Sequence, residues 1–95
     1  MSDSIAYRAA AKAIEDILAE RGRQDGKWGQ QNHDAGIWAL ILLEEIGEWA
    51  QAELHNKFSG EEAGRQNNEL IQVAAVAMAM LECNYRKGIK ESEGK

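Results

Sequence analysis

The sequence contains no proline and a single cysteine among its 95 residues. Without proline, no position is barred from a helix interior by a missing amide proton. The lone Cys83 excludes an internal disulfide and a cysteine-based zinc cluster, which fits a reducing compartment, and we expect it to be a small core residue. The two histidines, His33 and His55, lack the spacing of a zinc site.

Long apolar runs and an excess of positive charge are missing as well. The longest nearly apolar stretch, residues 70–81, is interrupted by Gln72 and falls short of the roughly 20 residues needed to span a bilayer. The first residues show neither the basic start nor the apolar core of a signal peptide. A formal net charge of -5 argues against binding to nucleic-acid polymers or to anionic membranes. We therefore expect a soluble, cytoplasmic protein.

Apolar residues recur with helical spacing along the chain, and no stretch alternates as a β-strand does. This pattern predicts an all-α fold. The first helix is expected to begin at a cap among residues 2–4 and to end near Arg21, before Gly22. The second helix is expected to start at residue 33 or 34 and to end near residue 56, and the third is expected over about residues 61–87.

Local signals place the ends of the later helices. Asp34 is a suitable N-cap for the second helix. Ser59 and Glu62 have the spacing of a capping box for the third helix, with a start near position 66 as the alternative. Gly88 is expected to end that helix. The resulting organisation is a single helical domain over residues 1–88 and a polar C-terminal tail over residues 89–95.

Two of the predicted helices are apolar on all sides. A helix of this kind is buried all round, and three helices from one chain can hardly cover two such elements. The economical solution is a helical bundle completed by homo-oligomerisation, as a homodimer or a homotetramer built from two dimers.

Three carboxylates interrupt the strongly apolar residues 40–50. At a helical advance of about 100° per residue, Glu45 shares its stripe with Trp38 and Trp49. Glu48 lies one turn further along the same side. Ionised carboxylates in low dielectric either take up a proton or recruit a positive partner, and a divalent cation would meet that demand. Glu44 lies about 100° around the helix from Glu45, where it could contact the metal ligands from behind or hold an attacking water.

Glu69 and Gln72 open the apolar part of the third predicted helix with the same three-residue spacing as Glu45 and Glu48. If the second and third helices pack antiparallel, both pairs face a shared cleft. Magnesium prefers hard oxygen ligands and is commonly held by carboxylates together with substrate phosphate. The pattern therefore predicts a site for Mg²⁺, with Mn²⁺ as the alternative ion.

The residues resemble the signature of the all-α nucleoside triphosphate pyrophosphatases. The segment Glu44 to Glu48 matches an EExxE motif, and Glu69 to Gln72 occupies the place of an ExxD motif. The resemblance extends over about residues 21–82 and is closest to the MazG-like proteins. It implies magnesium-dependent hydrolysis of a nucleoside triphosphate to a monophosphate and pyrophosphate.

The same resemblance implies roles for individual residues. Catalytic roles fall to Glu44, Glu45 and Glu48, and metal ligation falls to Glu45, Glu48, Glu69 and Gln72. The departure from the family pattern is Gln72, which stands where Asp is usual and removes one negative charge from the site.

The glycine-rich stretch of residues 21–33 is predicted to be a loop that contacts the substrate. Basic side chains in it, and Arg86 from the end of the third predicted helix, suit phosphates, and its aromatic and amide groups suit a base. The phosphate candidates are Arg21, Arg23, Lys27 and Arg86, and the base candidates are Trp28, Asn32 and His33. The alternative is a solvated connector with one tryptophan packed on the core. A second function also stays open, in which a non-catalytic helical oligomer binds nucleotide or a protein partner.

Overall fold

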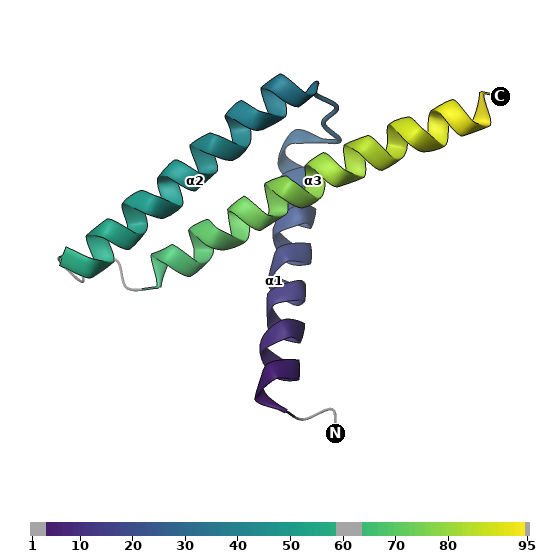
Figure 1. Ribbon diagram of the computed structural model, residues 1–95. Coiled ribbons are helices and arrows are strands. Elements are labelled where there is room, and N and C mark those ends of the chain that lie inside the picture. The colour runs from purple at the N-terminus through teal and green to yellow at the C-terminus, as the bar shows by residue number, and fades with distance from the viewer. Residues whose placement is uncertain (1–3, 59–63, 95) are drawn as a thin grey trace.

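The structure, a computed structural model, describes residues 4–58 and 64–94 and consists there of helices joined by short connections (Figure 1). The helices are α1 (Ile5–Trp28), α2 (Ala35–Phe58) and α3 (Arg65–Glu93). No strand occurs within these ranges, so the all-α prediction is confirmed. None of these helices is long and apolar enough to cross a lipid bilayer.

The first helix begins where the sequence predicts and ends later. Ser4 is the N-cap, and its Oγ accepts a hydrogen bond from the Tyr7 amide at 3.0 Å. The predicted end near Arg21 is wrong, because α1 continues through Gly22 and Gly26 to Trp28. Each internal glycine costs about 1 kcal/mol relative to alanine. Side-chain pairs one turn apart offset part of that cost.

Those pairs run through the segment that was predicted to be a loop. Arg23 Nη2 lies 2.6 Å from Glu20 Oε2, and Arg21 Nη2 lies 3.1 Å from Asp25 Oδ1. The helix ends at Trp28, and Gly29 is its C-cap. The φ of Gly29 is 73°, which suits glycine, and its amide donates to the Asp25 carbonyl at 2.8 Å. The predicted loop therefore shrinks to residues 29–34.

Asp34 caps α2, as predicted. Its Oδ1 accepts a hydrogen bond from the Ile37 amide at 2.9 Å, and its carbonyl accepts one from the Trp38 amide at 3.0 Å. The helix ends at Phe58, slightly beyond the predicted residue 56. This cap fixes the start of the helix that carries the acidic residues.

We predict that Asp34→Ala lowers the free energy of unfolding by about 1 kcal/mol, because the Ile37 amide loses its side-chain acceptor. Urea denaturation measures this loss. Asp34→Asn is the matched control, since it keeps an acceptor oxygen and is expected to cost less. Equal stability of the two variants would show that the cap contributes nothing.

The third helix departs from its predicted bounds at both ends. The proposed capping box of Ser59 and Glu62 lies outside the described residues, and α3 starts at Arg65, close to the alternative start. The prediction that Gly88 ends the helix is wrong, because residues 89–93 continue it. Those residues contain no proline, and a single glycine costs only about 1 kcal/mol in a long helix.

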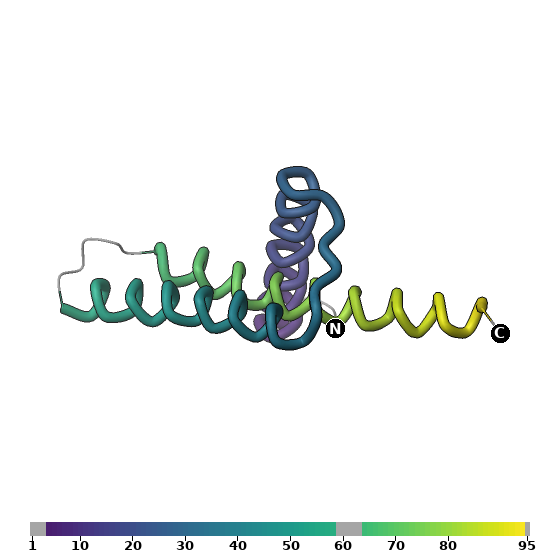
Figure 2. The backbone as a smooth tube through the Cα atoms, turned by 90° about the horizontal axis from the view of Figure 1, so that it is seen from above, coloured from purple at the N-terminus to yellow at the C-terminus, as the bar shows by residue number. Residues whose placement is uncertain are grey.

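Helices α2 and α3 run side by side in opposite directions, while α1 crosses α3 steeply (Figures 1 and 2). The buried core lies between α2 and α3 and consists of Trp38, Val76, Ala79 and Cys83. Cys83 is fully buried, which confirms its prediction as a core residue. The ring of His33 packs edge-on against Trp38, with 4.9 Å between the ring centroids.

A buried arginine joins α1 to α3. Arg21 is 8% exposed, and its Nε donates to Glu82 Oε2 at 2.7 Å while its Nη2 donates to Glu82 Oε1 at 3.1 Å. Its Nη1 also donates to Gln24 Oε1 at 3.2 Å. The Arg21 hydrogen bond holds the pKa of Glu82 below its usual range, despite partial burial of that carboxyl. This two-point contact fixes where the end of α1 lies over α3.

Candidate functional site

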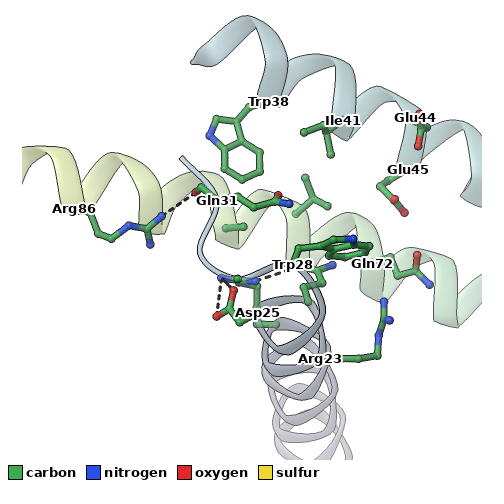
Figure 3. Close-up of a pocket in the computed structure, with 15 residues that line it drawn as sticks. Arg23, Asp25, Trp28, Gln31, Trp38, Ile41, Glu44, Glu45, Gln72 and Arg86 are labelled. Carbon is green, nitrogen blue, oxygen red and sulfur yellow. Dashed lines mark hydrogen bonds and ion pairs between the residues drawn. The ribbon is translucent and has the colours of Figure 1, made fainter. Parts of the chain in front are cut away.

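A cavity of about 220 Å³ opens where the end of α1, the first half of α2 and the middle of α3 meet (Figure 3). Carboxylates, arginines and aromatic rings line this cavity. The carboxylates include Glu44 and Glu45, the arginines include Arg23 and Arg86, and the rings are those of Trp28 and Trp38, while Gln72 adds an amide. Aliphatic contacts from Ile41 and Val76 complete the wall.

The acidic cluster, defined as Glu44, Glu45 and Glu48, lies on α2 at the rim of this cavity. One carboxylate oxygen from each residue lies within 4.8 Å of the others, an arrangement that can hold a metal ion. Glu45 and Glu48 are half-buried, whereas Glu44 is exposed. Glu44 and Glu45 line the cavity, and Figure 3 shows Glu45 directed from α2 toward the side where Trp28 and Gln72 lie.

Within the acidic cluster, Glu45 has a raised pKa. Burial, together with the charges of Glu48, Glu69 and Glu44, raises its pKa to about 6. Its Oε2 is buried and has no hydrogen-bond partner among the described residues. An unpaired buried carboxylate oxygen is costly, so this atom calls for a cation or a proton.

Glu69 approaches the cluster from α3. Its charge is one of the causes that raise the Glu45 pKa. Its side chain is 13% exposed, and Oε2 is buried without a hydrogen-bond partner in the part of the chain that the structure describes. Its Oε1 lies 3.6 Å from Arg65 Nε. Glu69 remains outside the tight group formed by the acidic cluster.

Gln72 lines the cavity one turn beyond Glu69 and also lines the groove between α1 and α3. Its amide supplies a neutral oxygen where a carboxylate would add charge. Gln72 is therefore placed beside the carboxylates rather than on another face.

The donor set fits a hard divalent cation. The acidic cluster supplies three carboxylate oxygens, which are donors that magnesium and manganese accept, and Glu69 and Gln72 on α3 could add a carboxylate and an amide oxygen. Two of the carboxylates also contain a buried oxygen without a protein partner among the described residues. Like charges gathered in a half-buried site are stabilised by such an ion.

Arg21 and Arg23, both predicted to bind phosphate, differ in how far their guanidinium groups are already engaged within the chain. Arg21 lines the cavity, but its guanidinium donors are directed to Glu82, Gln24 and Asp25. Arg23 lines the cavity, is exposed, and pairs with Glu20 on its own helix. Arg23 is therefore the better placed of the two to reach a ligand.

Trp28 forms an exposed aromatic wall at the end of α1. It is 52% exposed, lines the cavity, and lies beside Gln72 in Figure 3. Lys27 Nζ is 4.7 Å from its ring centroid, and Arg23 Cζ is 6.0 Å from it. These cations engage the ring electrostatically. Lys27 itself is not part of the cavity wall.

Arg86 ties the connection between α1 and α2 to α3. Its Nη2 donates to the Gln31 carbonyl at 3.0 Å and to Asn32 Oδ1 at 2.9 Å. Arg86 and Gln31 line the cavity, whereas Asn32 and His33 do not. In the structure Asn32 holds Arg86 and His33 packs on Trp38, so neither of these two base candidates faces the cavity.

Two functional neighbours are absent from the sequence predictions. Glu20 pairs with Arg23 and raises the Glu45 pKa through its charge, and Glu82 pairs with Arg21. The three-residue spacing of Glu20 and Arg23 is visible in the sequence, but it acts only if α1 continues past Gly22. Glu82 and Arg21 are far apart in the chain, and no local pattern joins them.

Comparisons of the chain with protein-family models, with curated proteins and with solved structures return no match.

Proposed function

We propose that this chain is a magnesium-dependent nucleoside triphosphate pyrophosphohydrolase of the MazG-like type, which releases a nucleoside monophosphate and pyrophosphate. The observation that carries the proposal is the acidic cluster at a cavity that Glu44 and Glu45 line, with buried oxygens of Glu45 and Glu69 lacking protein partners among the described residues. The motif resemblance in the sequence supplies the reaction class.

The cavity offers each part of a nucleoside triphosphate a chemically suitable neighbour. Arg23 and Arg86 supply positive charge for the phosphates, and Trp28 offers an exposed ring for the base. The acidic cluster would repel a bare triphosphate, so substrate binding requires a cation between them. The substrate and the metal are therefore expected to bind together.

Glu45, Glu48 and Glu69, with Gln72, would hold the cation. When bound, magnesium supplies charge neutralisation of the phosphates and lowers the pKa of a coordinated water. The exposed Glu44 carboxylate accepts the proton of the attacking water. The water oxygen forms a bond to the α-phosphorus, the bond from that phosphorus to the bridging oxygen breaks, and pyrophosphate leaves with the electron pair. Arg23 and Arg86 stabilise the negative charge on the phosphate oxygens.

The proposal includes a homo-oligomer, a homodimer or two dimers joined, that works in the cytoplasm. Large apolar side chains on every described helix are exposed in the single chain, among them Ile14, Leu40, Leu43, Leu54 and Tyr85. A bundle completed by further copies would cover such side chains.

The proposal is tested by incubating the protein with each common nucleoside triphosphate and magnesium and assaying pyrophosphate. Release that stops when the metal is chelated is the expected result. Release of orthophosphate instead would place cleavage at another bond and contradict the proposal.

One observation favours a second candidate function. Gln72 stands where the resembled motif has Asp, and its neutral amide lowers the charge available to a metal. A helical oligomer that binds nucleotide or a protein partner without hydrolysis is the resulting alternative. It is supported if no triphosphate yields pyrophosphate and the melting temperature does not respond to magnesium.

We predict that Gln72→Asp tightens magnesium binding by about tenfold, because it adds a negative charge beside the proposed site. Changes to residues that hold or orient metal ligands typically alter metal affinity by about 10–100-fold. Calorimetric titration of metal-free protein measures the change. The matched control is Gln51→Asp, an exposed position on α2 away from the cavity, which adds the same charge. Equal affinity of Gln72→Asp and the unmodified chain would place residue 72 outside the metal's surroundings.

A further inference from the structure

One face of α2 is apolar, exposed and unusually regular. Its members are spaced alternately four and three residues apart. This is the heptad spacing of coiled coils, in which two apolar positions recur every seven residues and pack against another helix. We call this face the α2 seam, and it consists of Gly36, Leu40, Leu43, Gly47, Ala50 and Leu54. All of its members are exposed, with Leu40 at 65%, Leu43 at 62% and Leu54 at 56%.

The α2 seam points away from the rest of the chain. At about 100° per residue, Leu54 lies opposite Glu45 around the helix axis, and Glu45 belongs to the side that meets α3 and the cavity. No charged residue occupies the six seam positions. The chain therefore presents an uncharged stripe to its surroundings along nearly the whole of α2.

No contact among the described residues explains Gly47 at the middle of the seam. A Cβ added there would meet no atom within 4 Å, so no described neighbour requires a glycine. Its backbone is helical, and a glycine inside a helix costs about 1 kcal/mol relative to alanine. Small residues at a helix surface allow another helix to approach closely, which accounts for the choice.

The surface area of the chain points to the same conclusion. The accessible surface is 6969 Å² for a mass of 10.5 kDa. A compact monomer of that mass exposes about 5,400 Å², and the excess of about 1,500 Å² exceeds the about 800 Å² that one partner buries in a standard interface. The radius of gyration is likewise 16.2 Å, compared with about 12 Å for a compact domain of this length.

We propose that the α2 seam packs against the α2 seam of a second copy, with the two helices crossing in opposite directions at Gly47. A two-fold interface brings the same patch from both subunits together, and an uncharged apolar stripe is complementary to itself. The pairing places α2 between its own α3 and the partner's α2, so both of its apolar sides are covered. This inference specifies the surface of the proposed homo-oligomer and does not depend on the proposed hydrolysis.

The mass in solution tests the interface. Sedimentation equilibrium is expected to give the unmodified chain at least twice 10.5 kDa, and Leu43→Glu is expected to halve the observed mass. Because Leu43 is exposed in the single chain, the charge costs little within the monomer, and circular dichroism should show retained helix. Leu81→Glu, a similarly exposed leucine on α3, is the matched control and should keep the full mass. A monomeric unmodified chain, or an undissociated Leu43→Glu, would overturn the proposal.

A second measurement remains decisive if Leu43→Glu fails to fold. Cys83 is buried, so a cysteine introduced at the seam is the reactive thiol. Under mild oxidation Gly47→Cys should give a covalent dimer at a rate that does not fall when the protein is diluted, since a disulfide needs the two Cβ atoms about 4 Å apart. Leu81→Cys should give dimers only at a concentration-dependent rate. A dimeric Gly47→Cys that forms no crosslink would place the interface on another face.

Discussion

Glu45→Gln is expected to reduce pyrophosphate release by at least about 100-fold, since even residues that only orient a metal ligand change affinity by about 10–100-fold. The carboxylate lies at the centre of the charges that surround the cavity, and its buried oxygen has no hydrogen-bond partner among the described residues. Glutamine keeps the shape but removes the charge that would hold the cation. Initial rates with saturating magnesium and substrate measure the loss.

The same substitution is expected to stabilise the metal-free protein. The pKa of Glu45 is raised to about 6, so the folded state binds a proton more tightly than the unfolded chain does. The ionised carboxylate therefore destabilises the fold above pH 6, and this penalty disappears as the pH falls toward 4.5, the ordinary value. Glu45→Gln removes the penalty. Partial exposure screens it to about 1 kcal/mol, compared with about 2 kcal/mol for the full pKa shift.

Urea denaturation in chelator at pH 8 and pH 4 tests this second effect. The gain should appear at pH 8 and vanish at pH 4. Glu53→Gln, at an exposed position of the same helix, is the control and should change stability little at either pH. A marked loss of metal-free stability in Glu45→Gln would instead identify Glu45 as a member of a structural ion pair.

Arg21→Met is expected to lower the free energy of unfolding by about 2–3 kcal/mol. Breaking a fully buried ion pair costs about 3–5 kcal/mol, and the partial exposure of Glu82 reduces that figure. The arginine makes a two-point contact with Glu82 and further contacts with Gln24 and Asp25, so its removal leaves acceptors without their donor. It also releases the hold of α1 on α3.

A double-mutant cycle with Glu82→Gln isolates the pair from the other contacts. The Glu82 pKa is lowered in the folded state, so the pair stabilises above the ordinary pKa of the carboxyl and this stabilisation is lost as the pH falls through the lowered value. The coupling energy should therefore decrease in acid. Lys12→Met, which breaks an exposed pair with Asp16 on α1, is the control and should cost much less stability. Equal losses in Arg21→Met and Lys12→Met would contradict the role of Arg21.

The sequence predicted those features that depend on local spacing. Helical periodicity placed Glu45 on the side of α2 that meets the cavity and Glu48 close to it, and the residue type of Asp34 marked the N-cap of α2. The antiparallel pairing of α2 and α3 followed from their short connection and brought Glu69 near Glu45. These predictions needed only the spacing of residues close together in the sequence and the assumption that α2 and α3 pack antiparallel.

The features that the sequence did not predict depend on sums of small energies or on distant partners. Gly22 and Gly26 indicated a loop, but side-chain pairs along that segment accompany a continuous helix. Arg86 was predicted as a phosphate contact, yet it also holds the connection between α1 and α2 through the Gln31 carbonyl. Contacts across more than 50 residues of sequence have no local signature.

Calorimetric titration of the metal-free protein with magnesium tests the central claim most directly, because it asks whether the carboxylates on α2 and α3 hold a cation. A cation site shared by these carboxylates predicts binding to the unmodified chain that is lost in both Glu45→Gln and Glu69→Gln and kept in Glu53→Gln. Binding of equal strength in all four proteins, or no binding to the unmodified chain, would contradict it.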